Sequence, residues 1–267
     1  MDRDAIDQAA QRLAAQRAGS APIAALPEAL RPPDLASGYL VQESVHAHLL
    51  AAGMGAIVGH KIGCTTAVMQ AFLGIASPCA GGIFATTVQH RQGRFGHGGY
   101  RRVGVECEIA VRLGRTLTAA DAPFNRARVA LAVDAVMAAI EVVDDRYDDY
   151  RVLGAPSLIA DDFFNAGCVL GAPVTDWREL DLESLAGEMR VNGSVVGRGR
   201  GADIMGHPLA ALAWLAELFA SRERSLKAGE FVMLGSVVET KWMNAGDTVT
   251  VVIDRLGAVE ASFPEWL

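Results

Sequence analysis

The residues best suited to chemistry are Glu106 and Glu108, which lie two positions apart in the apolar run 103–111, VGVECEIAV. The period of two in this run is typical of a β-strand, so both carboxylates point to the same face. Like charges at that spacing repel each other, and burial adds a desolvation penalty. Either one carboxylate is protonated, or a hard cation such as Mg²⁺, Mn²⁺ or Ca²⁺ lies between them. The alternative is an exposed antiparallel strand with two solvated glutamates.

A third carboxylate, Glu141, is the only charge within the apolar run 136–143, VMAAIEVV. A lone carboxylate in a buried strand is unfavourable without a partner. Three anions can be tolerated together only around a divalent cation. If Glu141 lies beside Glu106 and Glu108, the three therefore predict a metal site.

Lys61 lies in the β-prone run 57–63, IVGHKIG, between apolar residues and glycines. Lysine is rarely fully buried unless it is paired, so Lys61 either extends its amine to solvent or enters a site. No carboxylate lies near it in the sequence, so we expect it to act in the chemistry and to contribute little to stability. We expect His46 and His48 to be surface or packing residues.

The elements that position these residues change in character along the chain. The patterns predict helices over residues 2–17, from 34 or 37 to 53 or 55, and over 65–74. From Gly81 onward, short β-prone runs alternate with glycine-rich turns. We therefore divide the chain into a helical N-terminal part, residues 1–75, and a β-rich body, residues 76–267.

Within the body we predict helices over residues 126–136 and 210–220. Residues 189–197 read as a hairpin around Asn192 and Gly193, a pair strongly favoured in tight turns. The runs 231–235 and 248–253 are predicted strands. These elements outline a mixed α and β protein.

Composition excludes several classes of partner. The 267 residues carry a net charge of −7, which argues against nucleic acid and anionic membranes. We find no run of about 18 apolar residues, and the polar start does not resemble a signal peptide. The four cysteines are far apart with no C-x-x-C pair, which argues against a zinc site and for a reducing compartment. We expect a cytoplasmic protein.

The sequence resembles the fumarylacetoacetate hydrolase superfamily, and within it the branch of 2-keto-4-pentenoate hydratases and 4-oxalocrotonate decarboxylases. The similar segments run in order along nearly the whole chain. They are residues 59–66, GHKIGCTT, residues 105–110, VECEIA, residues 139–144, AIEVVD, and parts of 160–171 and 228–247.

This resemblance implies an α+β fold, with a helical N-terminal part on a mixed β-roll body, and a homo-oligomer, with a hydratase or decarboxylase partner as a further option. It implies that Mg²⁺ or Mn²⁺ is bound by Glu106, Glu108 and Glu141, and that Lys61 is the acid/base or substrate-orienting lysine. The substrate would be a small 2-oxo acid. Its contacts would come from Ile62, Cys79, Arg146 and Asp162.

The chain departs from the branch around the expected pocket. Cys79 stands where the branch usually has aspartate, Asp162 where asparagine is common, and Asp145 where Ser or Ala precedes the arginine. Phe163 and Phe164 replace small residues. We expect Cys79 to line the pocket and, with the phenylalanines, to select a less polar substrate than the branch's usual one.

The implied metal indicates a class of reaction. A 2-oxo acid chelates a cation through its carboxylate and keto oxygens, and the cation stabilises the resulting enolate. Our first hypothesis is a hydratase of a 2-hydroxydienoate in ring-cleavage catabolism, and the second is a decarboxylase or C–C hydrolase on the same site. The third is a non-catalytic partner subunit. A neighbouring dication would lower the pKa of Lys61.

Overall fold

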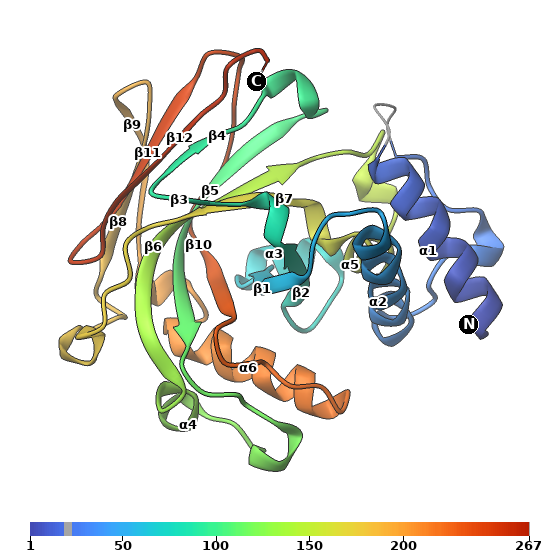
Figure 1. Cartoon of the computed structure of the whole chain (residues 1–267), viewed down its shortest axis with the longest axis horizontal. Coiled ribbons are helices and arrows are strands. Elements are labelled where there is room, and N and C mark those ends of the chain that lie inside the picture. The colour runs from blue at the N-terminus through green and yellow to red at the C-terminus, as the bar shows by residue number, and fades with distance from the viewer. Residues whose placement is uncertain (19–22, 267) are drawn as a thin grey trace.

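Two mixed β-sheets form the body of the protein, seen in a computed structural model that describes residues 1–18 and 23–266 (Figure 1). The larger sheet has seven strands in the order β2-β1-β10-β5-β6-β7-β3. These strands are β1 (Ile57–Gly63), β2 (Cys79–Phe84), β3 (Val88–His90), β5 (Val103–Leu113), β6 (Val133–Asp144), β7 (Asn165–Leu170) and β10 (Phe231–Trp242).

The smaller sheet has five strands in the order β4-β12-β11-β8-β9. These are β4 (Gln92–Arg94), β8 (Ala186–Val191), β9 (Ser194–Arg200), β11 (Thr248–Ile253) and β12 (Gly257–Ser262). The predicted hairpin is confirmed, because Asn192 and Gly193 join β8 to β9, both with positive φ. Only Asn, Asp and Gly adopt such angles readily, so this turn fixes the register of the pair.

The strands β5 and β6 form the centre of the larger sheet and pair antiparallel along their length. Both faces of β5 are buried. One face joins the main hydrophobic core, and the other ends in a smaller apolar cluster that includes Ala110, Met137, Ala139 and Met233. The expected apolar face is therefore present. The opposite face, which carries the glutamates, is enclosed as well.

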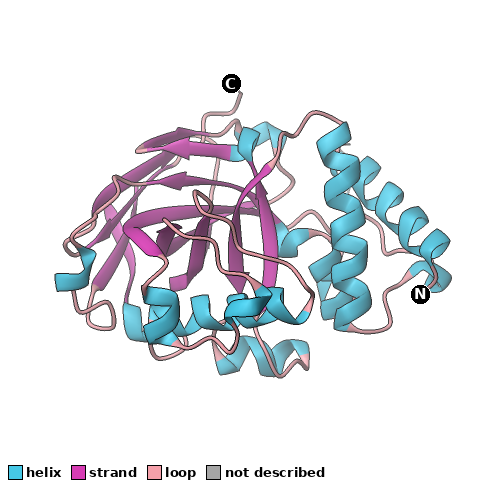
Figure 2. Cartoon of the chain, turned by 60° about the horizontal axis from the view of Figure 1, so that its bottom comes forward, coloured by secondary structure: helices cyan, strands magenta, loops and turns pink. Residues whose placement is uncertain are grey.

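Helices pack at one end of the sheets (Figures 1 and 2). They are α1 (Arg3–Arg17), α2 (Leu35–Ala51) and α5 (Ala155–Ala160), and α2 packs against both of the others. Asp34 caps α2 by accepting a hydrogen bond from the backbone N–H of Ser37 at 2.7 Å. The predictions for α1 and α2 are confirmed to within a few residues.

The helix α3 (Ala67–Leu73) begins after Thr66, whose hydroxyl accepts from the N–H of Met69, and ends at Gly74 in the left-handed conformation. It has no buried residue, and Val68 and Phe72 are exposed. The prediction of a helix here is confirmed. The helix α3 is therefore weakly packed.

The predicted helix over residues 126–136 is wrong in its second half. The helix α4 (Arg126–Ala130) spans five residues, and β6 begins at Val133. Val133 and Val136 pair with Leu113 and Val111 of β5. Tertiary strand pairing of β-branched residues has overridden the local helical pattern.

One segment, Gly201–Ser221, is long and apolar enough to cross a membrane by length and composition alone. Its regular helix, α6 (Pro208–Ser221), has 14 residues and is therefore roughly 21 Å long, shorter than the ~30 Å hydrocarbon core of a bilayer. It packs against β10 and α4, with Leu212 and Leu215 fully buried. We interpret α6 as a core helix of the fold.

The strand β1 lies within the larger sheet, parallel to β10 and antiparallel to β2. The helical N-terminal part therefore contributes one strand, which carries Lys61, to the sheet of the body. The division near residue 75 stays a proposal about domain organisation.

Candidate metal centre and active site

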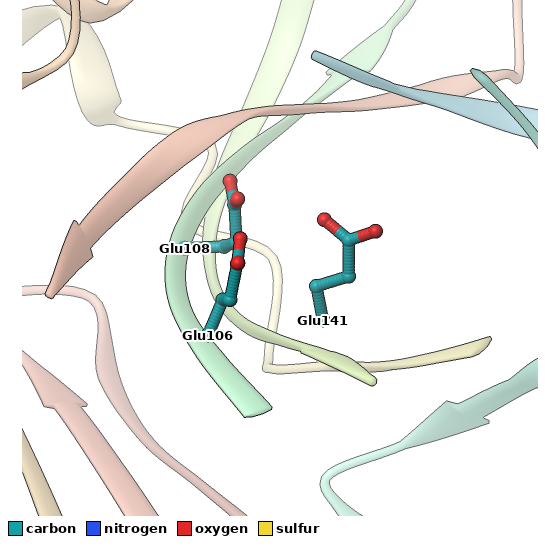
Figure 3. Close-up of side chains that lie close together, drawn as sticks. All are labelled: Glu106, Glu108 and Glu141. Carbon is teal, nitrogen blue, oxygen red and sulfur yellow. The ribbon is translucent and has the colours of Figure 1, made fainter. Parts of the chain in front are cut away.

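Three carboxylates meet where β5 and β6 pair (Figure 3). The pleat of β5 directs Glu106 and Glu108 to one face, and the register places Glu141 directly opposite Glu106. One carboxylate oxygen from each residue lies within 4.8 Å of those of the other two. Carboxylate oxygens gathered in this way suit a hard divalent cation.

Neighbouring groups hold each carboxylate in place. Glu108 accepts a hydrogen bond from the N–H of Gly235 at 2.7 Å, and Glu141 accepts one from the amide of Asn165 at 2.9 Å. The hydroxyl of Thr240 donates to Glu106 at 2.5 Å. Gly235 has a φ of +131° and leaves no room for a side chain, so glycine is required to bring this N–H to Glu108.

The electrostatics of the cluster favour a bound cation. Burial raises the pKa of Glu108 well above its ordinary value, and the charges of Glu141 and Glu106 add to the effect. Burial also raises the pKa of Glu141, against the opposing charge of Lys61. Three ionised carboxylates are thus unfavourable together unless positive charge is supplied. The donor set, its spacing and its burial fit a divalent metal ion.

Lys61 supplies one positive charge to this cluster. Its ammonium Nζ lies 3.2 Å from Oε1 of Glu141, and the two residues are only 3% and 1% exposed. The expectation that Lys61 contributes little to stability rested on the lack of a carboxylate near it in the sequence, but β-sheet pairing brings Glu141 to it from 80 positions along the chain. A buried ion pair makes Lys61 structurally important as well.

Without a bound metal ion, the neighbouring carboxylates determine the direction of the pKa shift of Lys61. Burial alone would lower the pKa of its ammonium group, but the charges of Glu141 and Glu106 outweigh burial and raise it. Lys61 is therefore held in its protonated form in this charge environment.

A cavity of about 370 Å³ opens beside the glutamates. Lys61, Ile62 and Glu106 line it, and Phe163 and Phe164 form part of its wall. The two phenylalanine rings meet edge to face, with centroids 5.5 Å apart. The structure thus brings together the predicted metal ligands, the lysine, Ile62 and the apolar wall.

Cys79 is placed elsewhere, which corrects the prediction that it lines the pocket. It is fully buried, and its neighbour Cys64 does line the cavity. The Cys64 thiol and burial raise the pKa of the Cys79 thiol. All four cysteines are free thiols.

Asp162 also lies away from the cavity lining. Its carboxylate is fully buried and pairs with Arg17 at 2.8 Å and with His46 at 2.6 Å. It also accepts a hydrogen bond from the N–H of Gly82 at 2.8 Å. Burial alone would raise the pKa of Asp162, but His46 and Arg17 hold it below its usual range. The residue ties α1 and α2 to β2, which is a structural role.

Arg146 belongs to a neighbouring buried network. Its guanidinium donates to the Asp161 carboxylate at 2.9 Å, and the hydroxyl of Tyr147 donates to the same oxygen at 2.9 Å. The structure does not bring Arg146 or Asp162 to the cavity wall. The proposed substrate contacts through these two residues are therefore replaced by contacts within the fold.

Asp145, which the sequence analysis placed around the expected pocket, lines the cavity. Tyr150 and Trp242 also line the cavity and were missed by the sequence reasoning. Tyr150 and Trp242 reach the cavity from a short 3-10 turn and from the end of β10, and sequence spacing does not reveal either position.

The fold and the site define an enzyme-like β-roll protein with a carboxylate centre for a divalent metal. The family model described as "Fumarylacetoacetate (FAA) hydrolase C-terminal" matches residues 80–263. The chain belongs to the fumarylacetoacetate hydrolase family, and the predicted resemblance and fold class are confirmed.

Two relatives and one solved structure show the likeness in detail. The 2-keto-4-pentenoate hydratase of Paraburkholderia phymatum is 34% identical over 264 residues, 99% of each chain. The 4-oxalocrotonate decarboxylase of Pseudomonas putida is 32% identical over 207 residues, 78% of this chain and 77% of its own. The structure of 4-oxalocrotonate decarboxylase from Pseudomonas putida G7, complexed with magnesium and adipate, has a TM-score of 0.91 at 28% identity, covering 98% of each chain.

Proposed function

We propose that this protein is a metal-dependent hydro-lyase that adds water to a 2-hydroxydienoate, the enol form of an unsaturated 2-oxo acid, in the breakdown of aromatic rings. The observation that carries the proposal is the cluster of Glu106, Glu108 and Glu141 with Lys61 beside it, of which Glu106 and Lys61 line one cavity. The near full-length likeness to 2-keto-4-pentenoate hydratases supports the same reaction.

The three glutamates would hold Mg²⁺ or Mn²⁺. When bound, the ion supplies an electrophile for the keto oxygen of a 2-oxo acid. Gly235 and Asn165 fix the orientation of Glu108 and Glu141 through the hydrogen bonds described above. The protein's contribution at this point is therefore a preorganised set of oxygen ligands.

Lys61 is the proposed acid/base residue. Addition of water to a conjugated chain requires a proton on one carbon and hydroxide on another. The Nζ of Lys61 holds a proton at the cavity wall, within 3.2 Å of Glu141, where it can deliver that proton or orient the substrate carboxylate. Phe163 and Phe164 exclude bulk water from one side of the cavity.

A decarboxylase or C–C hydrolase on the same site is the second candidate, and the likeness to 4-oxalocrotonate decarboxylase supports it. A non-catalytic partner subunit is a third candidate, although the complete carboxylate cluster favours catalysis. A homo-oligomer, a complex with a decarboxylase or hydratase partner, and a cytoplasmic location belong to the same proposal.

The test compares two substrates with purified protein. Loss of the dienoate absorbance of 2-hydroxypenta-2,4-dienoate would report hydration, and release of CO₂ from 4-oxalocrotonate would report decarboxylation. We expect hydration that EDTA abolishes and that Mg²⁺ or Mn²⁺ restores. Metal-dependent CO₂ release without hydration would favour the second candidate. Metal-supported stability with neither reaction would favour the third.

A further inference from the structure

The turn Asp162–Phe164 places two aromatic side chains on the cavity wall in an uncommon backbone conformation. Its three residues have φ values of 55°, 51° and 70°, in the left-handed region that large side chains rarely adopt. The buried pairs of Asp162 with Arg17 and His46 hold one end of the turn. Backbone strain of this kind persists only where the surrounding structure fixes it, and it is concentrated at active sites and ligand-binding sites. The mechanism proposed above uses the two phenylalanines only to exclude water.

The two rings belong to an apolar wall that begins beside the lysine. The Nζ of Lys61 lies 5.6 Å from the centroid of the Phe163 ring. The Phe164 ring lies 5.5 Å from that of Phe163, and the Tyr150 ring lies 5.3 Å from that of Phe164. All four residues line the cavity. A ligand held at Lys61 therefore has the Phe163 ring next to it, and further rings follow along the wall.

The helix α3 adds apolar side chains to the cavity lining. Met69 and Leu73 line the cavity, and the Phe72 ring lies 6.5 Å from that of Tyr150. Met69 is 40% exposed, and no residue of α3 is buried. Removal of such apolar surface from water is favourable, so an apolar group that covers it gains affinity.

The part of the cavity formed by β10 is less apolar. Ser236, Glu239 and Thr240 line it there, among apolar residues of the same strand, and Asp145 lines it directly after β6. An apolar chain laid over these groups would take them out of water without offering a hydrogen bond in return, which is unfavourable. The aromatic wall and α3 are therefore the better place for an apolar part of a ligand.

We propose that the turn Asp162–Phe164, Tyr150 and α3 form a subsite for an alkyl chain at the far end of the substrate, so that the preferred 2-hydroxydienoate carries a substituent of several carbon atoms. This inference rests on the proposed function. Since an extended chain advances roughly 1.3 Å per bond, the six bonds beyond the keto carbon of an eight-carbon 2-oxo acid span roughly 7.5 Å. That length exceeds the 5.5 Å between the Phe163 and Phe164 rings. The two bonds beyond the keto carbon of a four-carbon acid span only roughly 2.5 Å.

The experiment measures binding, so that it does not depend on turnover. The probes are 2-oxobutanoate and 2-oxooctanoate, which differ by four methylene groups, titrated calorimetrically in the presence of Mg²⁺. Each fully buried methylene raises affinity roughly fourfold. With part of the chain buried, we expect the parent to bind 2-oxooctanoate at least about tenfold more tightly than 2-oxobutanoate.

Phe164→Asn is the deciding variant. Asparagine adopts a positive φ more readily than phenylalanine, so the change keeps the turn and removes the apolar ring. It should reduce the ratio of the two affinities by at least about threefold, with little change in the Kd of 2-oxobutanoate. Should this variant fail to fold, Met69→Ser decides in its place with the same expected reduction, because α3 has no buried residue.

The matched control is Val68→Ala. Val68 is the neighbour of Met69 on α3, is 78% exposed and does not line the cavity, so its ratio should equal that of the parent.

A parental ratio below about tenfold, or an unchanged ratio in the deciding variant, would overturn the inference and leave the proposed function standing. Equally tight binding of 2-oxooctanoate in EDTA would also overturn it, because the probe would then bind away from the metal centre. Failure of the parent to bind either probe with Mg²⁺ would overturn the proposed function and this inference together.

Discussion

Replacement of Lys61 by methionine should reveal the structural and the chemical roles of this residue separately. Lys61 and Glu141 form a buried pair, and removal of one partner from such a pair destabilises a protein by roughly 3–5 kcal/mol. For a chain of this size each kcal/mol shifts Tm by roughly 2–4 °C. In EDTA, Lys61→Met should therefore melt on the order of 10 °C below the parent.

A divalent ion should reverse part of this loss. The ion neutralises Glu141 in place of the ammonium group, and the variant no longer repels it, so Mg²⁺ should bind the variant more tightly than the parent. Both proteins are stabilised by the ion, so at saturation the difference in their stabilities changes by RT ln of the ratio of their Kd values. If the variant binds Mg²⁺ about tenfold more tightly, the gap in stability narrows by about 1.4 kcal/mol, and the gap in Tm by roughly 3–6 °C. Turnover should stay reduced by a factor on the order of 10².

Thermal unfolding followed by circular dichroism, in EDTA and in Mg²⁺, measures the change in Tm. Steady-state kinetics measures the change in turnover. Lys241→Met is the matched control. Lys241 pairs with Glu239 at the surface, where the Glu239 side chain is 83% exposed, so its loss should change Tm little. A Lys61→Met protein that melts with the parent in EDTA would refute the buried pair. Full turnover would remove Lys61 from the mechanism.

Three further variants test other parts of the structure. Glu106→Gln should weaken Mg²⁺ binding at least tenfold by calorimetry with the fold intact, and parental affinity would exclude Glu106 as a ligand. Asp162→Asn should lose about 3 kcal/mol or more at pH 7 in urea unfolding, because Arg17 and His46 lose their buried partner. Because the pKa of Asp162 is lowered in the folded protein, its ionised carboxylate stabilises the fold above about pH 4, and this stabilisation is lost as pH falls below that value. The free energy of unfolding should therefore fall less steeply with decreasing pH in the variant than in the parent. Equal slopes in the two proteins would contradict this. Cys79→Asp should lower Tm by several degrees without shifting substrate preference, because it buries a carboxylate away from the cavity; a changed preference would place Cys79 at the substrate after all.

The carboxylate pair could be predicted from sequence because strand periodicity is a local property. Glu106 and Glu108 share a face wherever β5 lies in the fold, so their proximity follows from spacing alone. Glu141 required a further step, since only the β5–β6 register brings it opposite Glu106. The single charge in an apolar run indicated that such a partner existed. That charge did not indicate that Lys61 would pair with Glu141.

The roles of Cys79, Arg146 and Asp162 could not be predicted in this way, because each depends on contacts distant in sequence. Asp162 meets Arg17 from 145 positions earlier and His46 from 116 positions earlier. A charged residue near a motif looks the same in the sequence whether it faces a cavity or a buried partner. Burial and partners decide between these roles, and both arise only on folding.

The charge network around Asp162 also explains how the helices α1 and α2 affect the Lys61–Glu141 pair, although Asp162 does not line the cavity. Asp162 and Gln42 of α2 hold β2, through the N–H of Gly82 at 2.8 Å and the carbonyl of Ala80 at 2.9 Å. The strand β2 in turn pairs with β1 along six residues, including Lys61 opposite Gly81. Since Lys61 must stay within hydrogen-bond distance of Glu141, any shift of β2 would be transmitted to that pair. The helices α1 and α2 therefore help to position the lysine through β2, while β5 and β6 position the glutamates.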